Sequence, residues 1–234
     1  MRIFLITVLM LSLVSIVQAQ KGWFWINLNQ SPKDPKIFST DTQSGTGTRT
    51  HSLTNVPSGA LIVITVQCED AFGNATISST PSLTWTKRIE TAVVAGSGTS
   101  EIWTATYAVG GSISISSTLG SNNQSSVAWV ITNQETTLGG ASATASSQTA
   151  PSRTITSTRA NSILICVTSD WLARDGSSRN YRDNATEAYY YYSSGATTGY
   201  HYYKTTSTMA TYTEGLTIPN NQSAGTCVLE IRGN

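Results

Sequence analysis

Most of the tyrosines in this chain lie in one segment, EAYYYYSSGATTGYHYYK, which spans residues 187–204. A tyrosine ring has an apolar face that can stack on a sugar ring, and its hydroxyl forms hydrogen bonds. In an extended strand Tyr189 and Tyr191 face one way, whereas Tyr190 and Tyr192 face the other. The segment therefore predicts either a sugar-binding surface or a flat surface for self-association.

The turn within this segment decides which rings are exposed. If residues 193–198 turn the chain, Tyr200 and Tyr202 follow on a second strand, with one aromatic set inward and one outward. The residues predicted to bind a ligand are Tyr189, Tyr191, Tyr200 and Tyr202, together with Trp171 of the SDWLARDG loop. The alternative is that these tyrosines serve only as good strand formers.

Three carboxylates stand where two apolar strands are predicted to end. Glu69 and Asp70 follow ALIVITVQC, and Asp170 ends SILICVTSD. If these strands run in the same direction, the carboxylates meet and could bind Ca²⁺ or act as an acid/base pair on a glycosidic bond. The alternative is that acidic residues simply end strands in solvated loops. No Asp-x-Asp-x-Asp loop is present, so we predict no cofactor beyond this Ca²⁺ candidate.

The two histidines, His51 and His201, form no catalytic pattern in the sequence. Neither lies near a Gly-x-Ser-x-Gly segment or a partner at metal-binding spacing. A Ser/His/Asp triad assembled from distant residues stays open, but serine is too abundant to single one out. We therefore predict no catalytic residues.

The composition favours strands as the elements that position these side chains. Only 12% of the residues are charged, and 39% are hydrophobic. Ser, Thr, Gly and Asn replace the missing charge, which is typical of strands with solvated faces. Apolar and polar residues alternate along many short segments separated by Gly, Pro and Asn. The sequence predicts an all-β, antiparallel, two-sheet β-sandwich of the jelly-roll or immunoglobulin-like type, in a single domain.

Alternation also assigns the faces of the predicted strands. In ALIVITVQC, Ile62, Ile64 and Val66 share one side, with Leu61 and Val63 opposite. Strands that are apolar on both faces are expected at the centre of a sheet. This applies to residues 61–66 and 163–167.

The three cysteines, Cys68, Cys166 and Cys227, each lie in an apolar strand. We expect them to be small buried hydrophobes. A single disulfide between two of these strands is the alternative.

The first nineteen residues have the layout of a secretory signal peptide: Arg2, an apolar run, and small residues at 17–19. Residues 20–45 form an N-terminal lead-in segment, and residues 46–234 form the sandwich domain. We expect a secreted or cell-surface protein that does not insert into the membrane after signal removal.

The net charge of +1, without a cluster of Lys and Arg, argues against a nucleic-acid partner. The same weak charge argues against binding to anionic membranes.

The order of the predicted strands resembles that of a family of β-sandwich domains. An apolar strand is followed by SLTWTKR, EIWTATYAVGGSISISST and SSVAWVITNQETTLGGA, and later by NSILICVTSDW and GTCVLEI. Such domains occur, often repeated, in large secreted or cell-surface bacterial proteins. The resemblance covers about Thr48 to Arg232. It implies a β-sandwich with a non-catalytic role in adhesion or binding.

Three functions are compatible with the sequence. The first is a non-catalytic binding or adhesion module for a polysaccharide or cell-surface glycan, through exposed aromatic residues. The second is a structural subunit of an extracellular coat or filament, which self-associates by strand exchange. The third is an enzyme that acts on polysaccharide through the carboxylates at the strand ends.

Overall fold

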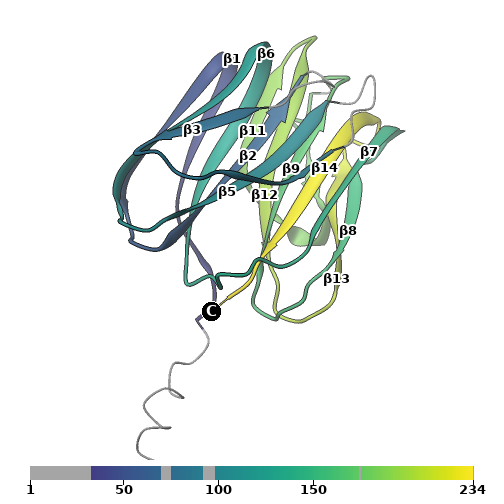
Figure 1. Ribbon diagram of the computed structural model, residues 1–234. Helices are drawn as coiled ribbons and strands as arrows, with labels where there is room; N and C mark the ends of the chain where they lie inside the picture. The colour runs from purple at the N-terminus through teal and green to yellow at the C-terminus, as the bar shows by residue number, and fades with distance from the viewer. Residues whose placement is uncertain (1–32, 70–74, 92–97, 174, 234) are drawn as a thin grey trace, which may run out of the picture. The chain divides into compact units, whose positions relative to one another are not determined.

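Antiparallel strands make up almost all of the computed structural model (Figure 1), which describes residues 33–69, 75–91, 98–173 and 175–233. The predicted signal peptide, residues 20–32 of the lead-in segment and Asp70 lie outside these ranges. Residues 34–234 form one compact unit, and the described part of it contains no α-helix. The prediction of an all-β sandwich is confirmed.

The first sheet contains the two longest strands of the molecule, which pair with each other. Its strand order is β1-β6-β2-β5-β4, with β3 added to β6. The strands are β1 (Lys36–Val56), β2 (Ala60–Cys68), β3 (Thr76–Thr80), β4 (Thr86–Glu90), β5 (Thr99–Tyr107) and β6 (Gly111–Thr132). Residues 36–45, which the sequence placed in the lead-in segment, are part of β1.

The second sheet packs on the first and carries the tyrosine-rich segment. Its order is β11-β12-β9-β14-β7. The strands are β7 (Ala141–Thr149), β9 (Ile163–Asp170), β11 (Thr186–Ser193), β12 (Thr197–Thr205) and β14 (Gln222–Ile231). The apolar strands β2 and β9 each have a neighbour on both sides, as predicted from their two apolar faces.

A third, small sheet was not predicted from the sequence. Its order is β10-β13-β8, and it packs on the face of the second sheet that turns away from the first. The strands are β8 (Ser152–Thr156), β10 (Asn180–Tyr181) and β13 (Thr211–Ile218), and a 3₁₀ turn, η1 (Arg182–Asn184), follows β10. Both faces of the second sheet are therefore covered.

Glycines allow the first sheet to curl over on itself. Gly47 of β1 and Gly120 of β6 have φ values of 71° and 60°, and the β1–β6 register shifts between Thr46 and Thr48. Such a φ is readily adopted only by glycine. The bend packs Ile113 and Ile115 of β6 onto Ile62 of β2.

Three apolar clusters result from this arrangement. The curl of the first sheet encloses one around Ile62, Ile64 and Val66, and the first and second sheets enclose another around Val63, Trp129 and Ile165. The third lies between the second and third sheets. The predicted faces of residues 61–66 are confirmed.

The three cysteines are buried in different clusters. Cys68 lies within the curl, Cys227 between the first two sheets, and Cys166 under the third sheet. Because Cys166 and Cys227 face opposite sides of the second sheet, the arrangement supports the prediction of buried hydrophobes over that of a disulfide.

Candidate functional site

The pairing of β11 with β12 separates the tyrosines that the sequence grouped together. Tyr190 lies opposite Tyr200, and Tyr189 lies opposite His201. Residues opposite each other in a sheet share a face. Tyr200 and Tyr202 therefore lie on the face covered by the third sheet, and neither is exposed to solvent. The two side chains are therefore buried in place of lining an exposed surface, and their role in ligand binding stays a prediction.

Tyr189 and Tyr191 lie on the other face, toward the first sheet, and are half-buried. The hydroxyl of Tyr189 donates to Ser44 Oγ of β1 at 2.9 Å, and that of Tyr191 donates to Asn123 Oδ1 of β6 at 3.3 Å. These two hydroxyls connect the two sheets. The predicted row of open rings is not formed.

A polar cluster lies on the outer face of the second sheet, beside the buried rings of Tyr200 and Tyr202. The guanidinium of Arg179 lies 4.0 Å from the ring centroid of Tyr190 and forms an ion pair with Glu187. The hydroxyl of Tyr181 also donates to Glu187, at 2.6 Å. Burial raises the pKa of Tyr190 to about 12, and the hydrogen bond from Arg179 lowers the pKa of Glu187. This cluster anchors the loop before β11.

Exposed aromatic side chains occur instead at one end of the second sheet. Trp171, from the predicted set, is 39% exposed, and Tyr192 is 39% exposed as well. Tyr192 lies opposite Thr198, which lies opposite Asp170 at the end of β9. The Cα atoms of Tyr192 and Asp170 are thus two strands apart, about 10 Å. We call Trp171, Leu172 and Tyr192, all exposed, the aromatic end.

Polar groups lie at the same end of β11 as Tyr192, but on the opposite face, which turns toward the first sheet. Asn123 accepts hydrogen bonds from the Tyr191 and Ser193 hydroxyls, and its side-chain amide donates to Glu69 Oε2 at 2.8 Å. Polar groups held in this way can bind a ligand without the entropic cost of being ordered first.

Asp170 holds the backbone that carries Trp171. Its fully buried carboxylate accepts hydrogen bonds from the backbone N–H groups of Leu172 and Ser223, both at 3.1 Å. The N–H of Trp171 donates in turn to the Ser223 carbonyl at 2.9 Å. Asp170 and Trp171, both singled out from the sequence, are thus connected: Asp170 positions the backbone of Trp171.

The ends of β2 and β9 lie close together, as the hypothesis of a carboxylate site requires. A Cβ atom added to Gly98 would be 2.8 Å from the Cys68 carbonyl oxygen and 3.0 Å from Ser169 Oγ. Glu69 binds Asn123, however, whereas Asp170 faces the loops just described. Among the described residues, which do not include Asp70, no three His, Cys, Asp or Glu side chains are grouped as a metal site would need.

A Ser/His/Asp arrangement that the sequence left open lies within the curl of the first sheet. His51 Nε2 is 2.9 Å from Ser126 Oγ, and His51 Nδ1 is 3.4 Å from Asp41 Oδ2. Burial lowers the pKa of His51, although Asp41 raises it. His51 and Ser126 are fully buried, so a substrate cannot reach the hydroxyl in this conformation. The spacing of these three residues along the chain contains no signal for this trio.

Among the described residues, no helix has the length and apolar character that crossing a bilayer requires. Comparisons with protein-family models, with curated proteins and with solved structures found no match to this chain.

Proposed function

We propose that this chain is a secreted, non-catalytic module that binds a polysaccharide or a cell-surface glycan at the aromatic end. The observation that carries the proposal is the position of Trp171 and Tyr192, two exposed rings at one end of one sheet. Exposed aromatic rings suit the apolar faces of sugars, and a tyrosine hydroxyl can bond to their hydroxyls.

The chemistry of the neighbouring carboxylates supports a binding role over hydrolysis. A glycosidase needs two carboxyl groups that both reach the scissile bond. Asp170 is fully buried and holds two backbone N–H groups, so it acts as a positioning residue for Trp171. Export of the chain is supported by the signal-peptide layout of residues 1–19.

A glycan array probed with the purified protein tests this proposal. We expect binding to at least one glycan class, and loss of this signal in Trp171→Ala and Tyr192→Ala. Met209→Ala is the control, because Met209 is also an exposed apolar residue but lies between β12 and β13, away from the aromatic end. A protein that binds no glycan, or variants that bind as well as the wild type, would reject the proposal.

A second candidate function, self-association in a coat or filament, is favoured by the edge of the first sheet. β1 has 21 residues and ends the strand order, and its Phe38 is 51% exposed. A long open edge can pair with an edge of another copy. Sedimentation at high concentration tests this proposal. Oligomers that dissociate when Phe38→Lys is introduced would support it, whereas a monomer at every concentration would count against it.

A further inference from the structure

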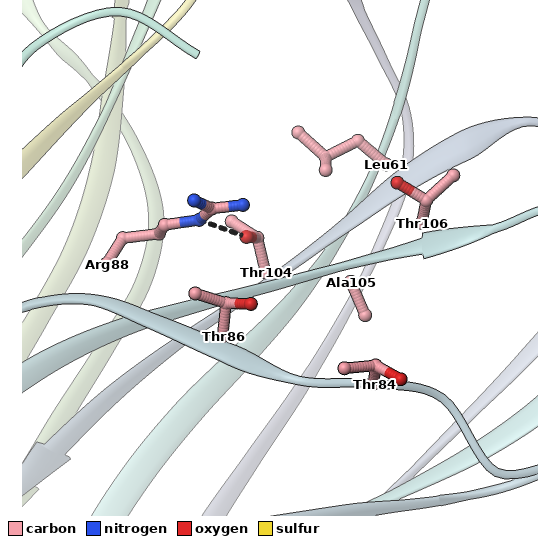
Figure 2. A pocket seen from close by; sticks show the side chains of 7 residues that line it. All are labelled: Leu61, Thr84, Thr86, Arg88, Thr104, Ala105 and Thr106. Carbon is pink, nitrogen blue, oxygen red and sulfur yellow. Dashed lines mark hydrogen bonds between the residues drawn. The ribbon is translucent and has the colours of Figure 1, made fainter. Parts of the chain in front are cut away.

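Two surface cavities lie where edge strand β4 of the first sheet approaches edge strand β7 of the second. One has a volume of about 310 Å³ and is lined from β4, β5 and the start of β2; Figure 2 shows its side chains. The other, of about 430 Å³, is lined from the loop before β7 and from β14. Arg88 lines both cavities and is the one charged residue among the described residues that line them. We call the two cavities together the Arg88 groove.

Arg88 is anchored at one nitrogen. Its Nε donates to Thr104 Oγ1 at 2.6 Å (Figure 2), and Thr104 is itself buried, whereas Arg88 is exposed. A guanidinium has five N–H donors, so this bond fixes the side chain and leaves donors for a ligand.

Arg88 differs from three other arginines, Arg159, Arg179 and Arg232, in its charge environment. Arg159 and Arg232 both pair with Glu135, and Arg179 pairs with Glu187. Within the part of the chain that the structure describes, no carboxylate forms an ion pair with Arg88. Its positive charge is therefore available to an anion from outside.

Threonines supply most of the polar groups in the Arg88 groove. They are Thr84, Thr86, Thr104, Thr106, Thr136 and Thr137. A threonine hydroxyl both donates and accepts hydrogen bonds, as the hydroxyls of a sugar do. A polyhydroxylated ligand matches this lining better than an apolar one does.

We propose that the Arg88 groove binds the carboxylate of an acidic sugar, a uronate residue within a polysaccharide. A planar guanidinium matches a planar carboxylate through two parallel hydrogen bonds. The threonine hydroxyls would then bind the hydroxyls of the same sugar and its neighbours.

The Arg88 groove is separate from the aromatic end. It includes Leu61, at the start of β2, whereas the aromatic end lies where β9 ends, beside the end of β2. The two sites can therefore be tested independently, and the groove does not depend on the function proposed above.

Calorimetric titration with oligosaccharides of galacturonate, glucuronate and mannuronate tests the proposal at low and physiological salt. Each oligosaccharide is compared with its methyl ester, which has the same hydroxyls but no charge. We expect at least one acid form to bind, with roughly ten- to a hundredfold weaker affinity for its ester. Arg88→Gln should lose a similar factor, and Arg88→Lys should retain part of the affinity because it keeps only the charge.

Arg153→Gln is the matched control, because Arg153 also donates through Nε to a hydroxyl, that of Ser142, but lies outside the groove. Trp171→Ala separates the two sites, since it should leave the difference between acid and ester unchanged. The proposal is overturned if no uronate binds, if acid and ester bind equally, if sulfated oligosaccharides bind in preference, or if Arg88→Gln binds like the wild type. Circular dichroism melts of the variants check that each is folded.

Discussion

His201 Nδ1 of β12 lies 2.8 Å from Thr65 Oγ1 of β2, and this contact joins the facing surfaces of the first two sheets. The other ring nitrogen of His201 lies 2.9 Å from Ser125 Oγ, which donates to Gln67 Oε1 at 2.9 Å. The indole of Trp129 donates to Thr65 at 3.0 Å. A chain of polar groups therefore crosses the apolar core, and it fixes how the two sheets face each other.

We predict that His201 stays neutral at pH values far below the ordinary pKa of a histidine. Burial, and secondarily the charge of His51, lower the pKa of His201 to about 3. Because the folded chain binds this proton less readily than the unfolded chain, the free energy of unfolding falls as pH drops below about 6.5 toward 3.

Proton NMR of the untagged protein measures this directly, because the chain has only two histidines. Burial lowers the pKa of His51 as well. Between pH 7.5 and 5, the ring signal of His201 should keep its neutral shift. A midpoint near 6.5 for that signal would show that the ring is accessible to solvent and that the described packing is wrong.

For Glu214 we predict a pH dependence of the free energy of unfolding that is opposite to that of His201. Its side chain is fully buried, and neither carboxyl oxygen has a hydrogen-bond partner among the described residues. Burial, with a smaller contribution from Asp183, raises its pKa to about 7. The folded chain keeps this proton where the unfolded chain has lost it. The free energy of unfolding should therefore fall by about 3 kcal/mol between pH 4.5 and 7.

Urea unfolding of Glu214→Gln at pH 5 and pH 8 checks this. Because the amide does not titrate, residue 214 of the variant should contribute the same free energy of unfolding at pH 5 and pH 8. At pH 8 the variant should be more stable than the wild type. Asp34→Asn, at an exposed position, is the control and should follow the wild type. A Glu214→Gln protein that is less stable than the wild type at pH 8 contradicts a buried, unpaired carboxyl.

Glu230 holds two loops through its buried carboxylate. It accepts hydrogen bonds from the hydroxyls of Ser157, Thr158 and Ser162 at 2.8, 2.8 and 2.9 Å. The backbone N–H groups of Thr158 and Gly140 also donate to it, at 2.8 and 3.3 Å. With so many donors, this side chain cannot move without leaving buried polar groups unpaired.

A pair of glycine variants tests how rigid this arrangement is. A Cβ atom at Gly139 would lie 2.0 Å from Glu230 Oε2, whereas one at Gly140 would meet nothing within 4 Å. We expect Gly139→Ala to lower the free energy of unfolding by about 2–3 kcal/mol and Gly140→Ala to change it by less than about 0.5 kcal/mol. Similar values for the two variants in urea unfolding would mean that Glu230 is free to move.

The sequence predicted the apolar strands well because each apolar segment buries a periodic face, whereas the polar strands β3 and β7 were not predicted. Residues 60–68, 99–107 and 163–170 appear as β2, β5 and β9 close to the expected bounds. The alternation in residues 61–66 also assigned each side chain to the correct cluster. Two-residue periodicity reflects burial directly, so it needs no knowledge of the partner strands.

The exposure of the tyrosines was harder to predict because a hairpin register depends on the turn. Ser193 pairs with Thr197, so three residues form the loop, and Tyr190 comes to lie opposite Tyr200. A loop one residue longer or shorter would have placed Tyr200 beside Tyr189 or Tyr191 instead. The predicted alternation of faces within each strand was correct, but the sequence does not determine the register between the two strands.

The third sheet and the Arg88 groove had no local signal. Whether a second layer covers a strand face depends on segments distant in sequence, such as β8 and β13 over Tyr200 and Tyr202. Arg88 lies in a predicted strand, SLTWTKRIE, with an ordinary alternation. Whether the charge of Arg88 is available to an external anion depends on which carboxylates lie next to it, and only the tertiary structure determines that.

We propose that Trp171 and Tyr192 contact a glycan, and the decisive measurement is the affinity of Trp171→Ala for the strongest ligand of the array. Calorimetry should give a dissociation constant roughly ten- to a hundredfold above that of the wild type, with Met209→Ala unchanged. A Trp171→Ala protein that is folded and binds this glycan with wild-type affinity would contradict the account.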